Sequence, residues 1–180
     1  MRDTDVQDKS GNLRGKTIAW GVCGGIGAVE AVRGLREIRR HGASVTAFAT
    51  PSALSFIGET ALEWASGRSA VLAFGADVPH LEPWSLVVIA PLTLNTLSKI
   101  ALGIGDNSVT LLAASQLGRR APLLLVPTMN LDLQAHPLYR EYRDRLTGWG
   151  VRFLESPQEE DRIKMPSPEA VAQEVLSWLS

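Results

Sequence analysis

The chain has 180 residues, 45% of them hydrophobic, which is enough for one well-filled core and favours a single domain. Its 18 basic and 19 acidic residues give a formal net charge of −1, which offers no electrostatic basis for binding nucleic acid or an anionic membrane. The single cysteine, Cys23, excludes an internal disulfide and any multi-cysteine metal site, so we expect no bound metal.

The amino-terminal residues 1–14 are polar and show no periodicity, which predicts a disordered lead-in before a single domain at residues 15–180. They also lack the apolar core of a signal peptide, and no apolar run in the chain reaches the roughly 18 residues that a membrane span needs. Together with the cysteine count, these features indicate a soluble protein of the reducing cytoplasm.

From residue 16 onward, short β-rich runs alternate with longer amphipathic segments. The first strand is expected at 17–22, followed by a helix that ends near residue 40 and a second strand at 44–50. Further strands are expected at 86–91 and 122–127, then a helix at 140–149, a short last strand within 150–155 and a helix at 168–179. The strands at 86–91 and 122–127 are almost continuously apolar, as in parallel strands covered on both faces. This order predicts an α/β, Rossmann-like (flavodoxin-like) three-layer sandwich with a parallel sheet.

In such a sheet, ligands bind at the carboxyl ends of the strands, so the residues that follow each strand are informative. The first strand runs into a glycine turn that contains Gly24, Gly25 and Ile26, suited to close backbone approach to a phosphate or a ring. Thr50 and Ser52 follow the second strand. These hydroxyls suit a phosphate monoester, although they also serve as helix caps without any ligand.

Short neutral side chains also follow the other two long strands. PLTLNT places Thr93, Asn95 and Thr96 after the third, and PTMN places Thr128 and Asn130 after the fourth. A neutral pocket of amides and hydroxyls suits an uncharged planar heterocycle with one phosphate better than a triphosphate, which calls for lysine, arginine and a metal. The four strand ends therefore favour flavin mononucleotide (FMN) as the cofactor.

Two longer motifs carry a resemblance to a known family. APLTLNTLSKIALGIGDN, at residues 90–107, and PTMN, at 127–130, are similar to the paired motifs APxSANTxxKIAxGxxDN and PxMNxxMWxxP of the homo-oligomeric flavin-containing cysteine decarboxylases. That family includes phosphopantothenoylcysteine decarboxylases and the peptidyl-cysteine decarboxylases of lantibiotic biosynthesis. The chain departs from the pattern at Leu94, where the family tends to have alanine, and at Leu133 and Gln134, where it has methionine and tryptophan.

The resemblance implies an enzyme in which FMN oxidises a cysteine-derived carboxylate, which then loses carbon dioxide and becomes an enethiol. By this resemblance Asn130 binds the substrate carboxylate, and His80 is the acid/base residue near the flavin. The implied FMN-binding residues are Gly24, Gly25, Ile26, Thr50, Ser52, Thr93, Asn95, Thr96 and Thr128. The substrate is then a peptide with a carboxy-terminal cysteine or a small thiol compound.

Other interpretations remain open at these residues. His80 lies eleven residues before Pro91, nearer than is usual for the family's histidine, and a surface or capping histidine is the alternative. A turn asparagine is the alternative for Asn130. Cys23 is the only cysteine, so the segment at 155–171 lacks the cysteine with which phosphopantothenoylcysteine decarboxylases reduce the enethiol. A phosphopantothenoylcysteine decarboxylase-like enzyme without this cysteine, or an FMN-dependent reductase of the dihydromethanopterin reductase type, is therefore a second interpretation.

The resemblance also implies a homotrimer, or a dodecamer built from trimers, with FMN held between subunits. Tryptophans such as Trp64 and Trp84 are candidates for exposed residues at such an interface, and ordinary core or surface positions are the alternative.

Overall fold

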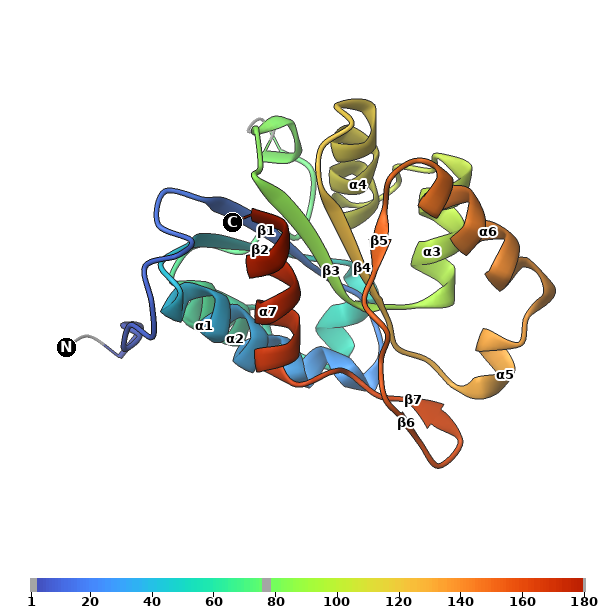
Figure 1. The fold of residues 1–180 in the computed structure, drawn as a ribbon, viewed down its shortest axis with the longest axis horizontal. Coiled ribbons are helices and arrows are strands. Elements are labelled where there is room, and N and C mark those ends of the chain that lie inside the picture. The colour runs from blue at the N-terminus through green and yellow to red at the C-terminus, as the bar shows by residue number, and fades with distance from the viewer. Residues whose placement is uncertain (1–2, 76–78, 180) are drawn as a thin grey trace.

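The computed structural model describes residues 3–75 and 79–179, and within these ranges the chain forms a three-layer α/β fold (Figure 1). The central sheet contains β1 (Thr17–Val22), β2 (Ser44–Ala49), β3 (Leu86–Leu92), β4 (Leu123–Pro127) and β5 (Arg152–Phe153). The helices are α1 (Ala31–Arg40), α2 (Glu59–Ser66), α3 (Leu94–Leu102), α4 (Ser108–Gly118), α5 (Leu131–Gln134), α6 (Pro137–Gly148) and α7 (Pro168–Leu179). Short 3-10 helices are η1 (Ile26–Glu30), η2 (Pro51–Ser55) and η3 (Pro79–Leu81), and a hairpin is formed by β6 (Gln158–Glu159) and β7 (Arg162–Ile163).

The sheet is parallel throughout, with strand order β2-β1-β3-β4-β5. The predicted Rossmann-like, flavodoxin-like fold is therefore confirmed, and the four long strands lie where their apolar runs predict them. This order reverses direction between β1 and β3. In open α/β sheets, that switch point is where the loops at the carboxyl ends of the strands diverge and leave room for a ligand.

Both faces of the sheet are covered, which explains the continuous apolar runs. Side chains alternate along a strand, so Trp20 and Val88 belong to the core under α1, α2 and α7, whereas Ala19 and Val87 belong to the core under α3, α4 and α6. Figure 1 shows these two groups of helices on opposite sides of the sheet. Helix α1 approaches the sheet closely because Gly34 has no side chain: a Cβ there would lie 2.5 Å from the Trp20 ring.

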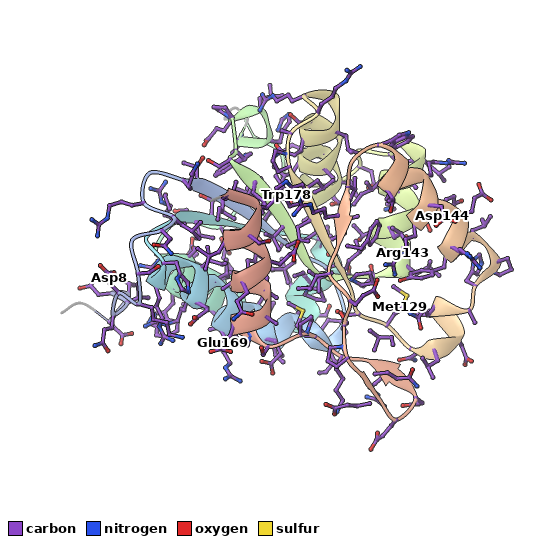
Figure 2. All side chains as sticks on the ribbon, viewed as in Figure 1. Asp8, Met129, Arg143, Asp144, Glu169 and Trp178 are labelled. Carbon is purple, nitrogen blue, oxygen red and sulfur yellow. The ribbon has the colours of Figure 1, made fainter. Side chains whose placement is uncertain are left out.

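The amino-terminal segment differs from the expected disordered lead-in. Leu13 is fully buried in the main core, and the Lys9 ammonium lies 2.6 Å from the carboxylate of Glu37 on α1. The backbone nitrogens of Lys9 and Leu13 donate to the carbonyls of Arg40 and His41. In Figure 2, the neighbouring residue Asp8 lies on the same side of the molecule as α1. A buried leucine, backbone hydrogen bonds and ion pairs of Lys9 hold this segment, and none of them produces a periodic pattern.

Trp84 also differs from the exposed position considered for it, because only 6% of its surface is exposed. It packs edge-on against Phe48 with the ring centroids 5.9 Å apart, and its indole nitrogen donates to the Pro79 carbonyl at 2.9 Å. A tryptophan can be buried in this way because its one polar group finds an acceptor. Among the helices that the structure describes, none is long and apolar enough to cross a membrane.

Candidate functional site

The carboxyl ends of β1, β3 and β4 meet around one hollow with a volume of about 180 Å³. Its walls are the glycine turn at residues 24–27, Thr93, residues 128–130, Leu133, and Arg162 and Ile163 of the hairpin. The hollow lies at the topological switch point, where a doubly wound sheet is expected to bind its ligand. The sequence-predicted residues that it brings together are Gly24, Gly25, Ile26, Thr93, Thr128 and Asn130.

The glycine turn depends on close approach rather than on a left-handed backbone. A Cβ at Gly24 would lie 2.4 Å from the Ser52 hydroxyl oxygen and 2.8 Å from the Ser52 carbonyl carbon, so this residue packs directly against the turn after β2. Gly25 is extended, with φ −168°, and a Cβ there would meet only the Thr93 methyl, at 3.8 Å. Gly24 therefore joins two turns, whereas Gly25 leaves the wall of the hollow open.

At the end of β3, Thr93 caps α3 by accepting a hydrogen bond from the Thr96 backbone nitrogen, and its hydroxyl donates to the Thr96 hydroxyl at 3.3 Å. Thr96 is buried, whereas Asn95 is exposed on the first turn of α3, and neither lines the hollow. Cys23 is fully buried beneath this turn. Burial raises the pKa of its thiol to about 11, against the opposing effect of hydrogen bonds with Thr96 and Thr93, so the thiol is protonated at neutral pH.

The turn after β2 does not reach the hollow directly. Thr50 is 4% exposed and caps η2 by accepting from the Ala53 nitrogen, and the hydroxyls of Thr50 and Ser52 lie 3.2 Å apart. Ser52 is exposed and contacts the glycine turn at Gly24. These residues border the site through the backbone of the first turn.

At the end of β4, Asn130 is exposed and has an extended backbone at the start of α5, but its side chain does not cap that helix. The amide therefore makes no capping hydrogen bond, and a turn asparagine stays the alternative interpretation of this residue. Thr128 donates to the Val126 carbonyl at 3.3 Å, and its methyl group lies 3.1 Å from where a Cβ of Gly27 would be. Met129, labelled in Figure 2, is buried between them.

The β6–β7 hairpin is bonded to this last turn. The backbone nitrogen of Ile163 donates to the Met129 carbonyl at 2.8 Å, and that of Leu131 donates to the Asp161 carbonyl at 3.1 Å, with Asn130 paired antiparallel to Arg162. The hairpin is thus one wall of the hollow, and a second hollow of about 300 Å³ continues outward past Ile26, Val29, Glu30 and residues 162–165. The sequence patterns assign no role to Arg162, Lys164 or Met165, because strands of two residues leave no recognisable periodicity.

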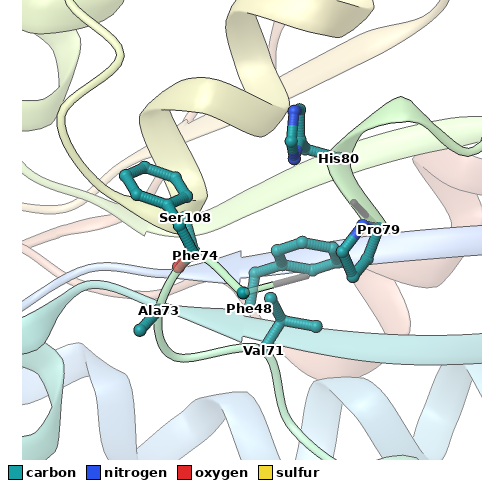
Figure 3. A pocket seen from close by; sticks show the side chains of 8 residues that line it. Phe48, Val71, Ala73, Phe74, Pro79, His80 and Ser108 are labelled. Atoms are coloured by element: carbon teal, nitrogen blue, oxygen red, sulfur yellow. The ribbon is translucent and has the colours of Figure 1, made fainter. Parts of the chain in front are cut away.

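His80 lies elsewhere. It lines a separate small hollow with Phe48 of β2, Phe74 and Ser108 at the start of α4 (Figure 3). Neither of the hollows beside Asn130 includes it. Within one chain, the structure therefore does not bring the two predicted catalytic residues together.

The charge around the main hollow is low. Its lining is neutral apart from Arg162, whose Nε lies 3.2 Å from the carboxylate of Asp161. Within residues 3–75 and 79–179, no group of histidine, cysteine and carboxylate side chains could hold a metal ion. The arrangement suits a largely uncharged planar ligand and does not resemble a metal-dependent phosphate site.

Comparison with known proteins places the chain in a family. Residues 6–180 match the family described as Flavoprotein. The chain belongs to the Flavoprotein family. Its motif-based resemblance is thereby confirmed at the family level. A curated relative, the coenzyme A biosynthesis bifunctional protein CoaBC of Thermococcus kodakarensis, is 35% identical over an alignment of 178 residues that covers 95% of this chain and 44% of that protein. The chain thus spans less than half the length of this relative.

Solved structures share the fold. A PPC decarboxylase mutant complexed with pantothenoylaminoethenethiol superposes with a TM-score of 0.81 at 24% identity, covering 93% of this chain and 100% of that one. The FMN-dependent cysteine decarboxylase SpaF gives a TM-score of 0.80 at 24% identity, covering 93% and 98%. At this identity the likeness concerns the fold.

Proposed function

We propose that this protein binds FMN in the hollow at the carboxyl ends of β1, β3 and β4 and catalyses the oxidative decarboxylation of a cysteine-derived carboxylate. One observation carries the proposal: the glycine turn, Thr93, Thr128 and Asn130, which come from separate motifs of the sequence, line a single hollow at the switch point of a flavoprotein fold. The family match and the names of the related proteins support the same chemistry.

The residues present fit a flavin. Gly25 leaves open space at the wall, Thr93 and Thr128 offer hydroxyls without charge, and the exposed apolar side chain of Ile26 offers a surface for a ring. We assign Thr50, Ser52, Asn95 and Thr96 to the surroundings of the cofactor, where they fix the turns that contact it. When bound, FMN supplies the two-electron oxidation of the substrate that makes loss of carbon dioxide possible.

Asn130 is proposed to bind the substrate carboxylate. Its amide has two N–H donors and is not used to cap α5, so it can hold a carboxylate beside the hollow without taking part in the fold. Holding this group fixes which carbon–carbon bond breaks. The hairpin residues Arg162 and Ile163 cover the same hollow and limit the access of water.

His80 is proposed as the acid/base residue, and it requires a second copy of the chain. Because His80 lines a different hollow from Asn130, the two can meet only across an interface between subunits. The rim of the site carries three exposed apolar side chains, Ile26, Val29 and Leu133, which are 65%, 46% and 46% exposed. A homotrimer or a dodecamer of trimers would cover them.

For the substrate we propose a chemical class: either a peptide with a carboxy-terminal cysteine or a small thiol carboxylate. The only cysteine is buried below the site, so the described chain offers no thiol at the hollow to reduce an enethiol product. An FMN-dependent reductase of the dihydromethanopterin reductase type is the second candidate, favoured by the separation of His80 from Asn130. It predicts FMN binding without carboxylate recognition.

The experiment is to incubate the FMN-loaded protein with cysteine-ended peptides and with phosphopantothenoylcysteine, and to follow the mass change that accompanies loss of carbon dioxide and two hydrogens. Asn130→Asp is expected to keep FMN and abolish the reaction, because a second carboxylate repels the substrate. Full activity of both Asn130→Asp and His80→Asn would contradict the assigned roles. FMN reduction without any loss of carbon dioxide would favour the reductase.

A further inference from the structure

The short segment that carries His80 has little structure of its own. It is a single 3-10 turn at Pro79–Leu81 followed by residues 82–85, with one internal bond from the Glu82 nitrogen to the Pro79 carbonyl and another from the Trp84 nitrogen to the Glu82 carbonyl. His80 is half-buried, and Leu81 is 49% exposed. So short a turn needs contacts from outside to keep one conformation.

On one side of His80 the contact comes from the core. The buried Trp84 indole donates to the Pro79 carbonyl at 2.9 Å, and Trp84 itself is held by Phe48 and by Gln116 of α4. The Gln116 amide donates to the carbonyls of Trp84, at 3.4 Å, and Pro122, at 2.9 Å. These residues fix the residue before His80 and are also part of the packed interior.

On the other side the contact comes from one exposed side chain. Arg119, the residue that follows α4, donates from one terminal nitrogen to the Leu81 carbonyl and from the other to the Glu82 carbonyl. The planar guanidinium can hold two successive carbonyls at once, which a single ammonium cannot do in the same geometry. Arg119 is exposed, and both carbonyls that its guanidinium contacts belong to this segment, so its main structural effect falls there.

We propose that Arg119 is a positioning residue for His80: it fixes the backbone directly after the histidine and thereby sets where the imidazole is presented. This inference rests on the acid/base role given to His80 under the proposed function. It adds a residue outside the two sequence motifs, because Arg119 lies beyond the motif that ends at residue 107.

The test is a double-mutant cycle on the FMN-loaded protein. Arg119→Ala is expected to lower kcat by about 10- to 100-fold, with KM and FMN content unchanged, because a shift of about 1 Å in a catalytic group has effects of that order. Arg119→Lys should recover part of this loss. In a His80→Asn background, Arg119→Ala should have no further effect. Arg140→Ala, at a side chain that is 91% exposed on α6, is the matched control and should match wild type.

A second measurement does not depend on activity. The rate at which diethylpyrocarbonate modifies His80, measured by peptide mapping against His136 in the same sample, should rise several-fold in Arg119→Ala and stay unchanged in Arg140→Ala. The inference would be overturned if Arg119→Ala kept the wild-type kcat, or if it lowered kcat as much in the His80→Asn background as in wild type. Equal modification rates of His80 in Arg119→Ala and in wild type would also overturn it. If wild type decarboxylates no thiol carboxylate, the proposed function fails separately, and the modification rates still decide whether Arg119 positions His80.

Discussion

Two adjacent glycines in the turn after β1 should respond differently to alanine. In Gly24→Ala the new methyl group would lie 2.4, 2.6 and 2.8 Å from the hydroxyl oxygen, Cβ and carbonyl carbon of Ser52. Because one of these atoms belongs to the backbone, rotating the serine side chain cannot relieve the overlap. Overpacking of this kind lowers the free energy of unfolding by roughly 1–3 kcal/mol. Because a backbone atom is involved, we expect a loss of about 3 kcal/mol for Gly24→Ala.

In Gly25→Ala the new methyl group has only the Thr93 methyl within 4 Å, at 3.8 Å, and the extended backbone suits any residue. The flavin-free protein should therefore be as stable as wild type or more stable by about 0.4–1 kcal/mol, because alanine restricts the unfolded chain. The methyl group nevertheless stands on the wall of the hollow. We expect FMN to bind at least about tenfold more weakly, since a loss of about 1.4 kcal/mol in binding free energy has that effect.

The assay is thermal unfolding of the flavin-free variants by circular dichroism, followed by FMN titration. A loss of about 3 kcal/mol should lower the Tm of Gly24→Ala by about 6–12 °C. Adding Ser52→Gly should recover part of it, because the serine hydroxyl and Cβ are removed while the carbonyl carbon stays. Gly118→Ala, at the end of α4 with no atom within 4 Å, is the control. An unchanged Tm in Gly24→Ala, or wild-type FMN affinity in Gly25→Ala, would refute this reading of the turn.

Three further predictions test the site and the fold. Asn130→Ala should keep FMN and the wild-type Tm while decarboxylation falls at least about 100-fold, and a matching loss of stability would instead indicate a structural role. The Cys23 thiol, whose pKa burial raises to about 11, should not react with Ellman's reagent in the native protein at pH 8, although it should react after denaturation. Burial alone would raise the pKa of Glu37, but hydrogen bonds from Lys9 and Arg40 outweigh it and lower that pKa. Its contribution to stability is therefore present above the unfolded pKa of 4.5 and lost as the pH falls through the folded pKa. In urea unfolding at pH 7, Glu37→Gln should lower the free energy of unfolding by about 1–3 kcal/mol. The variant should also lose less of its stability than wild type as the pH falls below 4.5. The same loss of stability at low pH in both proteins would contradict this assignment.

Much of the fold is predictable from the sequence because burial on two faces leaves a strong signal. β3 and β4 are apolar at every position, so their limits agree with the predicted strands to within a residue. The residues that follow them are polar and small, which marks the carboxyl edge of the sheet before any strand order is known. The pattern alone therefore predicts that Gly25, Thr93, Thr128 and Asn130 lie at this edge, and all four line the hollow.

The remaining features depend on contacts between distant segments. The β6–β7 hairpin has strands of two residues and is held by backbone hydrogen bonds to residues 129–131, so no periodic sequence pattern predicts it. The position of His80 depends on the packing of its segment against Phe48 of β2 and against α4, although it precedes β3 in the chain. Because β2 and β4 are separated by two strands in the sheet, a histidine beside one cannot reach an asparagine after the other.

The most direct test of the account is an FMN titration of the flavin-free protein and of Gly25→Leu side by side. We predict that wild type binds FMN to saturation and turns yellow, and that Gly25→Leu keeps its circular dichroism spectrum but binds no FMN, because the larger side chain fills the hollow. A wild-type protein that binds no flavin, or equal binding by both proteins, would show that this hollow is not the flavin site.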